Sequence, residues 1–215
     1  MGEFFIRTKG KSERSIFFFH GYGADKENLV PAGIFISKHV PNADVIVVDG
    51  VELCDKEMGY RWFSYDKSNR AGESEEERAR TNYLQNFSKI ESSINDIMVK
   101  RNIHYENVVM MGFSQGASVS LDMGLRKGVL AIVSFAGALV DPDVEIFAPQ
   151  RTKVMLAHGT YDNVVPFSYM KSTKNILQNN GVHVECIVEE GQGHCISIDM
   201  LNSAVEFLNG TVESK

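Results

Sequence analysis

The segment at residues 107–127 limits the possible fold more than any other part of the chain. Four apolar residues, 108–111, precede the pentapeptide GFSQG at 112–116, and a segment that can be helical follows. This order predicts a strand, a sharp turn and a helix in immediate succession, which is the setting of the G-x-S-x-G nucleophile elbow. Gly112 and Gly116 lack the side chains that would collide in so tight a turn. We therefore expect Ser114 to lie in the open at the start of a helix.

Strand-like and helix-like segments alternate along the rest of the chain. Apolar or alternating runs predict strands at 3–8 (an edge strand), 15–19, 43–48, 129–135, 153–157 and 182–188. Helical spacing of apolar residues marks 27–40, 74–101, 167–179 and 198–208. The alternation predicts an α/β fold with a largely parallel central sheet and helices on both faces. In such sheets the active site lies at the carboxyl ends of the strands.

The chain shows no internal boundary. Its 215 residues are enough for one sizeable core, and no repeat, low-complexity segment or linker divides them. We therefore expect residues 1–215 to form a single α/β domain. Residues 49–72 follow neither the helical nor the strand period, so they are expected to form a long loop, and loops of this length tend to be functional.

Charge and cysteine usage restrict the partners and the compartment. The net charge of -6, without clustered Lys and Arg, argues against nucleic-acid binding. The three cysteines are an odd number, spread widely and without a C-x-x-C motif, which favours reduced thiols in the cytoplasm. The N-terminus lacks the pattern of a secretory signal, and the apolar runs are too short for stable membrane insertion.

The serine at the elbow needs a base, and the base needs a carboxylate to orient it. In α/β hydrolases these residues follow in the chain order Ser, Asp or Glu, His, each in a loop after a strand. Asp162 follows the strand at 153–157, and His194 lies in a glycine-rich loop after the strand at 182–188. His20 and His158 each precede a glycine at a strand end and could be structural hydrogen-bonding groups near the site. No metal-binding motif is present.

Four motifs in register resemble the phospholipase/carboxylesterase family of α/β hydrolases, which includes the acyl-protein thioesterases. They are HGYGAD at 20–25, GFSQGA at 112–117, the segment 158–166 with His158-Gly159, Asp162 and Val165-Pro166, and Gly193-His194. Trp62-Phe63 also resembles a family pair, with Ser64 where the family commonly has Asp. The resemblance runs from His20 to His194, nearly the whole chain.

The resemblance implies a serine carboxylesterase or acyl-thioesterase that needs no cofactor. Ser114 would be the nucleophile, Asp162 the orienting carboxylate and His194 the base, which agrees with the choice made from the residues. The backbone N–H groups of Tyr22 and Gln115 would form an oxyanion hole. An ester or thioester carbonyl would be attacked by Ser114, and water would then hydrolyse the acyl-enzyme.

The residues leave the substrate and some alternatives open. Trp62 and Phe63 in the aromatic loop, with Val165 near the acid loop, could line an apolar acyl site, which favours hydrophobic acyl esters, lipid-like esters or an acylated protein as substrate. A lysophospholipase or an acyltransferase could use the same Ser, Asp and His residues. A non-catalytic binding protein on a hydrolase scaffold is the other alternative, because a fold alone does not determine function.

Overall fold

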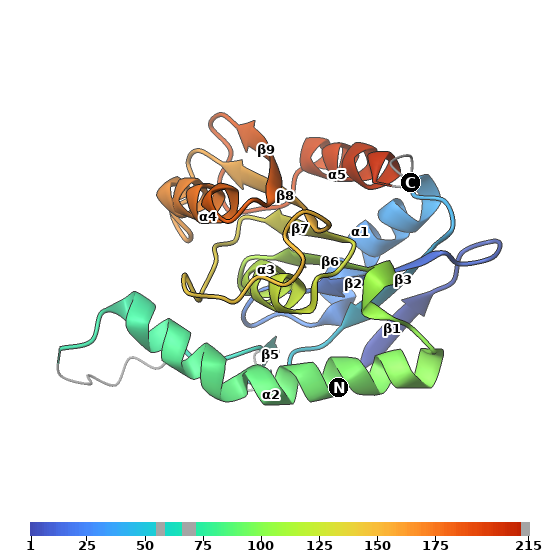
Figure 1. The fold of residues 1–215 in the computed structure, drawn as a ribbon, viewed down its shortest axis with the longest axis horizontal. Coiled ribbons are helices and arrows are strands. Elements are labelled where there is room, and N and C mark those ends of the chain that lie inside the picture. The colour runs from blue at the N-terminus through green and yellow to red at the C-terminus, as the bar shows by residue number, and fades with distance from the viewer. Residues whose placement is uncertain (55–58, 66–71, 212–215) are drawn as a thin grey trace.

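Seven strands form one sheet in the order β1-β3-β2-β6-β7-β8-β9. The computed structural model describes residues 1–54, 59–65 and 72–211, and Figure 1 shows their arrangement. The strands are β1 (Glu3–Ile6), β2 (Arg14–Phe19), β3 (Ala43–Val48), β6 (Val108–Phe113), β7 (Ala131–Phe135), β8 (Lys153–Gly159) and β9 (His183–Glu189). β1 pairs antiparallel with β3 at one edge, and the other neighbours pair parallel. The prediction of a largely parallel sheet with an N-terminal edge strand is confirmed.

The inner strand β2 shows why residues 16–19 are apolar without a break. All six of its residues are buried. Phe17 and Phe19 belong to the hydrophobic core on one face of the sheet, whereas Ile16 and Phe18 belong to the core on the other face. Side chains alternate between the two faces of a strand, so a strand that is covered on both sides favours apolar residues at consecutive positions.

Helices cover both faces of the sheet, as predicted (Figure 1). They are α1 (Lys26–His39), α2 (Glu75–Arg101), α3 (Gln115–Lys127), α4 (Phe167–Asn179) and α5 (Ile198–Gly210). Apolar residues of α2, α3 and α4 join the core that contains Phe17, and those of α1 and α5 join the core that contains Ile16. Within the described ranges no helix has both the length and the apolar character needed to cross a membrane.

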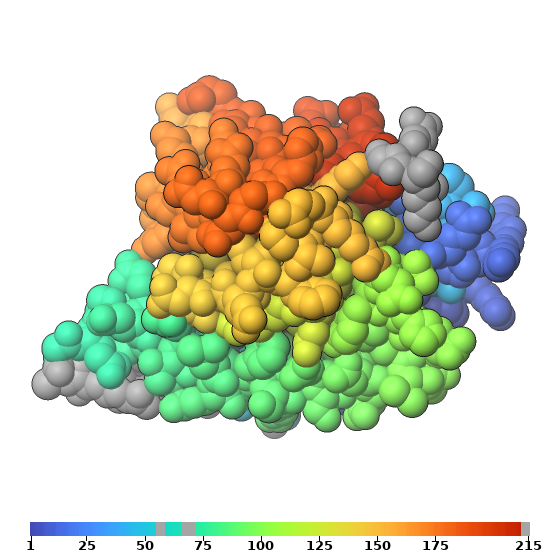
Figure 2. All heavy atoms as spheres, viewed as in Figure 1, coloured from blue at the N-terminus to red at the C-terminus, as the bar shows by residue number. Residues whose placement is uncertain are grey.

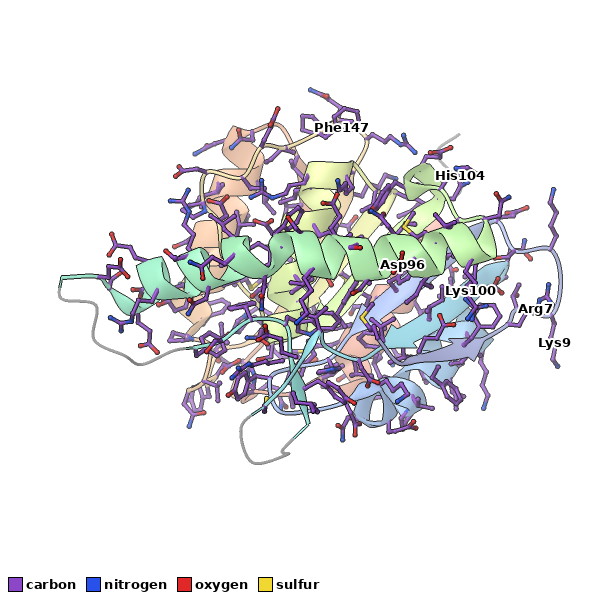
Figure 3. All side chains as sticks on the ribbon, turned by 90° about the horizontal axis from the view of Figure 1, so that it is seen from below. Arg7, Lys9, Asp96, Lys100, His104 and Phe147 are labelled. Atoms are coloured by element: carbon purple, nitrogen blue, oxygen red, sulfur yellow. The ribbon has the colours of Figure 1, made fainter. Side chains whose placement is uncertain are left out.

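The long helix α2 begins at a capping box. The Ser74 hydroxyl accepts the Glu77 N–H at 3.1 Å, and the Glu77 carboxylate accepts the Ser74 N–H at 2.7 Å. Figure 3 shows α2 crossing the outside of the molecule, where Asp96 and Lys100 are exposed to solvent. Because one side of the helix is exposed and the other is buried, apolar residues recur every three to four positions, and this spacing identifies the helix in the sequence.

Residues 49–72 differ in part from the expected loop. β4 (Glu52–Leu53) and β5 (Tyr60–Arg61) pair antiparallel as a small second sheet. Strands of two residues are too short to show a hydrophobic period, which is why the sequence does not reveal them. Residues 55–58 and 66–71 of the expected loop lie outside the described residues.

Side-chain amides hold the backbone of residues 62–64 in place after β5. Gln115 accepts the Trp62 N–H with Oε1 and donates Nε2 to the Phe63 carbonyl, each at 2.9 Å. Asn86 donates to the Trp62 carbonyl at 3.1 Å, and Asn82 of the same helix donates to the Ser64 carbonyl at 3.0 Å. Backbone groups buried away from a sheet need such partners, so α2 and α3 together fix this segment beside the elbow.

Candidate active site

Ser114 lies in a strained turn between β6 and α3. Its backbone angles are φ 55° and ψ -119°, and a positive φ is uncommon for a residue other than glycine. A Cβ atom on Gly112 would overlap the Gly116 carbonyl, and one on Gly116 would overlap the Phe19 carbonyl. The turn therefore requires both glycines of the pentapeptide. Strain of this kind is retained where the surrounding structure fixes it, often at functional sites.

Asp162 and His194 come from the loops after β8 and β9 and meet in a hydrogen bond. His194 Nδ1 lies 2.7 Å from Asp162 Oδ2. The other carboxylate oxygen of Asp162 accepts the N–H groups of Val164 at 2.9 Å and Val165 at 2.8 Å. Burial opposes ionisation of this carboxyl group, but the hydrogen bonds from His194 and the two backbone groups hold its pKa below the ordinary value. An ionised Asp162 favours the His194 tautomer with the proton on Nδ1.

Ser114 and His194 line the same cavity, whose volume is about 1300 Å³. The ring of Phe113, the residue before the serine, lies 4.8 Å from the His194 ring between centroids. The structure therefore brings together the three residues that the sequence singles out, because β6, β8 and β9 are parallel and end at the same edge of the sheet.

The glycine loop after β2 lies directly against the elbow. A Cβ atom on Gly21 would lie 3.3 Å from the Ser114 Cβ. The N–H groups of Tyr22 and Gln115 have no hydrogen-bond acceptor among the described residues. Gln115 is the first residue of α3, where N–H groups lack partners within the helix and carry a partial positive charge. Two such donors can stabilise a negative charge that develops on an oxygen beside Ser114.

The two other histidines near the site are buried and bond to backbone groups. His20 accepts the Gly50 N–H with Nε2 at 2.8 Å, and its Nδ1 lies 2.7 Å from the Gly21 carbonyl. His158 Nε2 lies 2.8 Å from the Val165 carbonyl and 3.3 Å from Asp162 Oδ2. The backbone contacts of both histidines are of the structural kind that the sequence suggests for these positions.

The cavity wall contains two of the three residues expected to bind substrate. Phe63 and Val165 line the cavity, whereas Trp62 is fully buried and is not among the lining residues. The Trp62 indole donates to the His20 carbonyl at 2.8 Å, so this side chain supports the glycine loop from behind. An aromatic pair in a loop does not reveal in the sequence which of its two rings faces the cavity.

Other wall residues are not identified by the sequence reasoning. Ala79 of α2 and Leu139 and Val140 of the loop after β7 line the cavity. That loop follows a parallel strand at its carboxyl end, which is the one sequence signal that could have pointed to it. Among the described residues, no group of three or more His, Cys, Asp and Glu side chains is arranged to hold a metal ion.

A doubly covered parallel sheet with a serine elbow, an Asp-His pair and unpaired N–H groups is the architecture of the α/β serine hydrolases. The chain belongs to the phospholipase/carboxylesterase family, whose model matches residues 1–212. The resemblance seen in the motifs is thus confirmed, and the protein is a serine hydrolase of the carboxylic-ester class.

Individual relatives match over most of their length. The chain is 24% identical to the esterase YpfH of Escherichia coli K12, with 97% of this chain and 88% of the relative covered. It is 25% identical to acyl-protein thioesterase 1 of Neurospora crassa, with 81% and 72% covered. The crystal structure of esterase PE8 superposes with a TM-score of 0.85 at 25% identity, with 96% of this chain and 97% of that chain covered. The Bacillus cereus carboxylesterase, at 20% identity and a TM-score of 0.79 over 97% and 93%, shares the fold.

Proposed function

We propose that this chain hydrolyses carboxylic esters or thioesters through an acyl-enzyme formed on Ser114. The proposal rests on the position of His194 between Asp162 and the cavity. Asp162 holds the Nδ1 side of His194 at 2.7 Å, and His194 lines one cavity with Ser114. An imidazole with its proton on Nδ1 presents Nε2 as a base, and a base in the cavity is what a serine hydroxyl needs to become a nucleophile.

Acylation follows from this arrangement. Ser114 Oγ attacks the carbonyl carbon of the substrate while His194 Nε2 accepts the hydroxyl proton. The carbonyl oxygen becomes negatively charged and accepts hydrogen bonds from the N–H groups of Tyr22 and Gln115. When the tetrahedral intermediate collapses, the bond to the leaving oxygen or sulfur breaks, and His194 gives its proton to the leaving alcohol or thiol. Asp162 stabilises the imidazolium ion between these two steps.

Deacylation repeats the sequence with water as the nucleophile. His194 takes a proton from water, the resulting hydroxide attacks the acyl carbon, and the ester bond to Ser114 Oγ breaks. The proton then returns to Ser114, and a carboxylic acid leaves the cavity. The two half-reactions together consume one ester and one water and release one acid and one alcohol or thiol.

The cavity supports substrates with an apolar acyl group. Phe63, Leu139, Val140 and Val165 supply apolar surface to its wall, and pockets of this kind bind apolar groups by excluding water. A thioester to a protein cysteine belongs to the proposal because acyl-protein thioesterases are among the similar proteins. We also propose that residues 1–215 form a single domain, because strands from both ends of the chain share one seven-stranded sheet. The three free cysteines support a cytoplasmic location.

A fluorophosphonate probe tests the proposal directly, because it reacts with an activated serine and not with an ordinary one. We expect a single labelled peptide containing Ser114, no labelling in Ser114→Ala, and loss of p-nitrophenyl ester turnover in that variant. Ser118→Ala is the matched control, because Ser118 lies on the same helix and lines the same cavity. Absence of labelling would support the non-catalytic alternative, and wild-type turnover by Ser114→Ala would reject Ser114 as the nucleophile.

The leaving group is tested by pairing oxygen esters and thioesters of the same acyl chain. A series from acetyl to dodecanoyl, measured as kcat/KM with both leaving groups, separates a preference for the acyl chain from a preference for sulfur. We expect kcat/KM to rise from acetyl to medium chains in both series. A flat series would show that the apolar wall does not bind the acyl group.

A further inference from the structure

Two parts of the cavity wall come from elements far apart in the sequence. Ala79 belongs to α2, whereas Leu139 and Val140 belong to the loop between β7 and β8. Figure 2 shows this loop, in yellow, lying between α2, in green, and the orange C-terminal part of the chain. The width of the cavity at this place depends on how closely the loop is held to α2.

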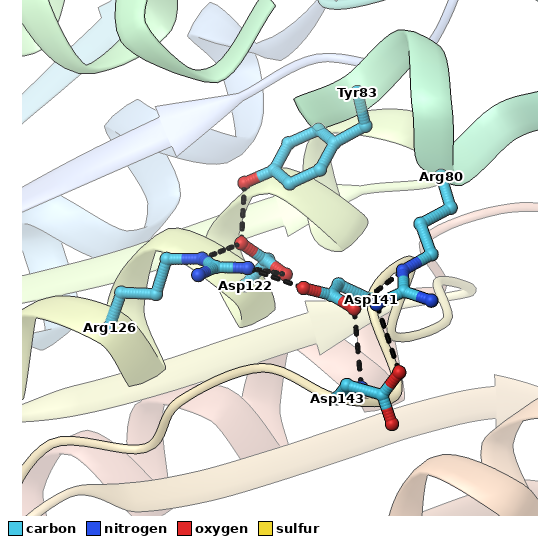
Figure 4. Close-up of polar contacts among 6 residues, drawn as sticks. All are labelled: Arg80, Tyr83, Asp122, Arg126, Asp141 and Asp143. Carbon is cyan, nitrogen blue, oxygen red and sulfur yellow. Dashed lines mark hydrogen bonds and ion pairs between the residues drawn. The ribbon is translucent and has the colours of Figure 1, made fainter. Parts of the chain in front are cut away.

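An ion pair joins the two parts directly behind the wall. Arg80 follows Ala79, and its Nε lies 2.8 Å from Oδ1 of Asp141, which follows Val140. Arg80 Nη2 also lies 2.9 Å from Asp143 Oδ2. Figure 4 shows Arg80 reaching from α2 to both carboxylates of the loop. Each partner of this ion pair is therefore the chain neighbour of a lining residue, so a change in the separation of Arg80 and Asp141 would move the two wall segments relative to each other.

Buried charges anchor Asp141 from the other side. Arg126 Nη2 lies 2.6 Å from Asp141 Oδ2, and Arg126 Nε lies 2.6 Å from Asp122 Oδ1. Tyr83 of α2 donates its hydroxyl to Asp122 at 2.8 Å, and Asp122 is fully buried. Charges in such a setting interact strongly and leave a large penalty when one partner is removed. Asp141 is therefore fixed to α3 through Arg126, and its contact with Arg80 lies nearer the surface.

A second tether fixes the loop on the side of α4. The Leu139 N–H donates to the Thr173 hydroxyl at 3.0 Å, and Thr173 is buried. The wall residues Leu139 and Val140 thus lie between a hydrogen bond to α4 and the ion pairs of Asp141. With the loop held at both ends, Arg80 contacts it directly from α2, one turn before Tyr83 joins the same helix to Asp122.

We propose that Arg80 is a positioning residue that sets the width of the acyl groups that the cavity accepts. Through Asp141 and Asp143 it holds α2 against the wall formed by Leu139 and Val140, and it does so without lining the cavity itself. The inference rests on the proposed hydrolysis through Ser114, because a preference among acyl groups is measured with that reaction.

Isomeric acyl groups test the width of the cavity apart from its apolar character. The p-nitrophenyl esters of valerate and 3-methylbutyrate have the same number of carbon atoms and the same leaving group, but the branched chain is wider. In Arg80→Gln we expect the ratio of kcat/KM for the branched to the linear ester to rise about threefold to tenfold, which is at or below the lower end of the range of about tenfold to 200-fold that one extra or missing methylene produces in a hydrophobic pocket. Turnover of the acetate ester should change less than about twofold, because acetate has no chain to fill the cavity.

Two further variants separate positioning from general destabilisation. Asp141→Asn should raise the same ratio by at least as much as Arg80→Gln, because it weakens both the pair with Arg80 and the pair with Arg126. Adding Arg80→Gln to Asp141→Asn should change the ratio little further, because the contact between Arg80 and Asp141 is already weakened in the single variant. Arg101→Gln is the matched control, because Arg101 lies on α2 and pairs with Glu3 at 2.9 Å, and neither residue lines the cavity. All assays are run well below the Tm of each variant, measured in parallel.

The outcomes distinguish this inference from the proposed function. A wild-type protein without esterase activity would reject the proposed function. An active wild type whose branched-to-linear ratio is unchanged in both Arg80→Gln and Asp141→Asn would overturn the role of Arg80 alone. An equal rise of the ratio in Arg101→Gln would also overturn it.

Discussion

Gly50 donates its backbone N–H to His20 Nε2 at 2.8 Å, and this contact determines which imidazole nitrogen carries the proton. Since Nε2 is the acceptor, the proton is on Nδ1, which donates to the Gly21 carbonyl at 2.7 Å. That carbonyl and the Tyr22 N–H belong to one trans peptide unit and point in opposite directions. A neutral His20 therefore fixes the direction of the N–H group proposed as an oxyanion donor.

Protonation of His20 should lower the stability of the folded protein. Burial lowers the pKa of His20, so below pH ~6.5 the unfolded chain binds the proton more readily than the folded chain does. The free energy of unfolding should fall as the pH drops below ~6.5, until it reaches the lowered pKa. The expected loss between pH ~7.5 and ~5.5 is up to about 1.4 kcal/mol from this group.

Urea unfolding at the two pH values measures this effect when wild type is compared with His20→Gln. The variant retains polar atoms at the site but does not titrate, so its stability should depend less on pH by about the same amount. His183→Gln is the control, because the His183 side chain is 63% exposed. An identical pH dependence in wild type and His20→Gln would contradict the prediction.

Loss of the Asp162 charge should slow the reaction with little change in the fold. Asp162→Asn keeps the shape of the side chain, but an amide can donate to His194 Nδ1 and so favour the wrong tautomer. In serine proteases the corresponding change costs about ten thousand-fold in kcat, and we expect a loss of that order here. Steady-state kinetics with p-nitrophenyl acetate measures it. Asp96→Asn, at an exposed position of α2 (Figure 3), should have wild-type activity; a kcat for Asp162→Asn within tenfold of wild type would refute the assigned role.

The elbow and the order of the site residues are predictable because their signals are local. The pentapeptide around Ser114 specifies a turn that only glycines at 112 and 116 permit. Asp162 and His194 each follow a recognisable strand, and a parallel sheet brings such positions to one edge. None of these inferences requires knowledge of distant contacts.

The cavity wall is not predictable in the same way, because it depends on contacts between distant elements. Ala79 looks in the sequence like any residue on the apolar side of α2, and it lines the cavity beside Leu139 and Val140, which come from a distant part of the chain. Trp62 and Phe63 are adjacent aromatic residues, and hydrogen bonds from Gln115 and from the asparagines of α2 hold the segment in which Phe63 lines the cavity. Neither relationship leaves a periodic pattern in the sequence.

Removal of the Gln115 amide should weaken both the fold and substrate binding. Gln115→Leu leaves the Trp62 N–H and the Phe63 carbonyl buried without this partner, and each such group costs about 1–3 kcal/mol. The free energy of unfolding, measured in urea, should therefore fall by the sum of the costs of these two groups. KM should rise as well, because Phe63 lines the cavity. Gln178→Leu, at an exposed position of α4, is the control. A variant with wild-type stability would mean that the amide does not hold the segment.

The negative charge of the cavity predicts which leaving groups the enzyme prefers. Glu75 and Glu76, in the first turn of α2, line the cavity, and no Lys or Arg is found among its described lining residues. The Tyr169 hydroxyl donates to Glu76 at 2.7 Å and holds the pKa of that carboxyl group below its ordinary value, so Glu76 is ionised at neutral pH. Such a cavity favours cationic over phosphate-bearing groups.

A choline ester and the 3,3-dimethylbutyl ester of the same acid measure this preference, because the two alcohols have nearly the same shape and differ in one positive charge. We expect the wild type to favour the choline ester, and each of Glu75→Gln and Glu76→Gln to reduce the ratio of kcat/KM by about 1.5-fold to 5-fold, the value of an exposed ion pair. The preference should shrink as salt is added, because salt screens exposed charges.

Glu77→Gln is the control, because it removes a charge from the same turn but outside the cavity lining. Gln also completes a capping box, so the ratio of kcat/KM in this variant should equal that of the wild type. If the wild type hydrolyses both esters equally, or if Glu77→Gln reduces the ratio as much as the other two changes do, the carboxylates in the cavity do not select the leaving group, and a lysophospholipid becomes as suitable a substrate as a neutral ester.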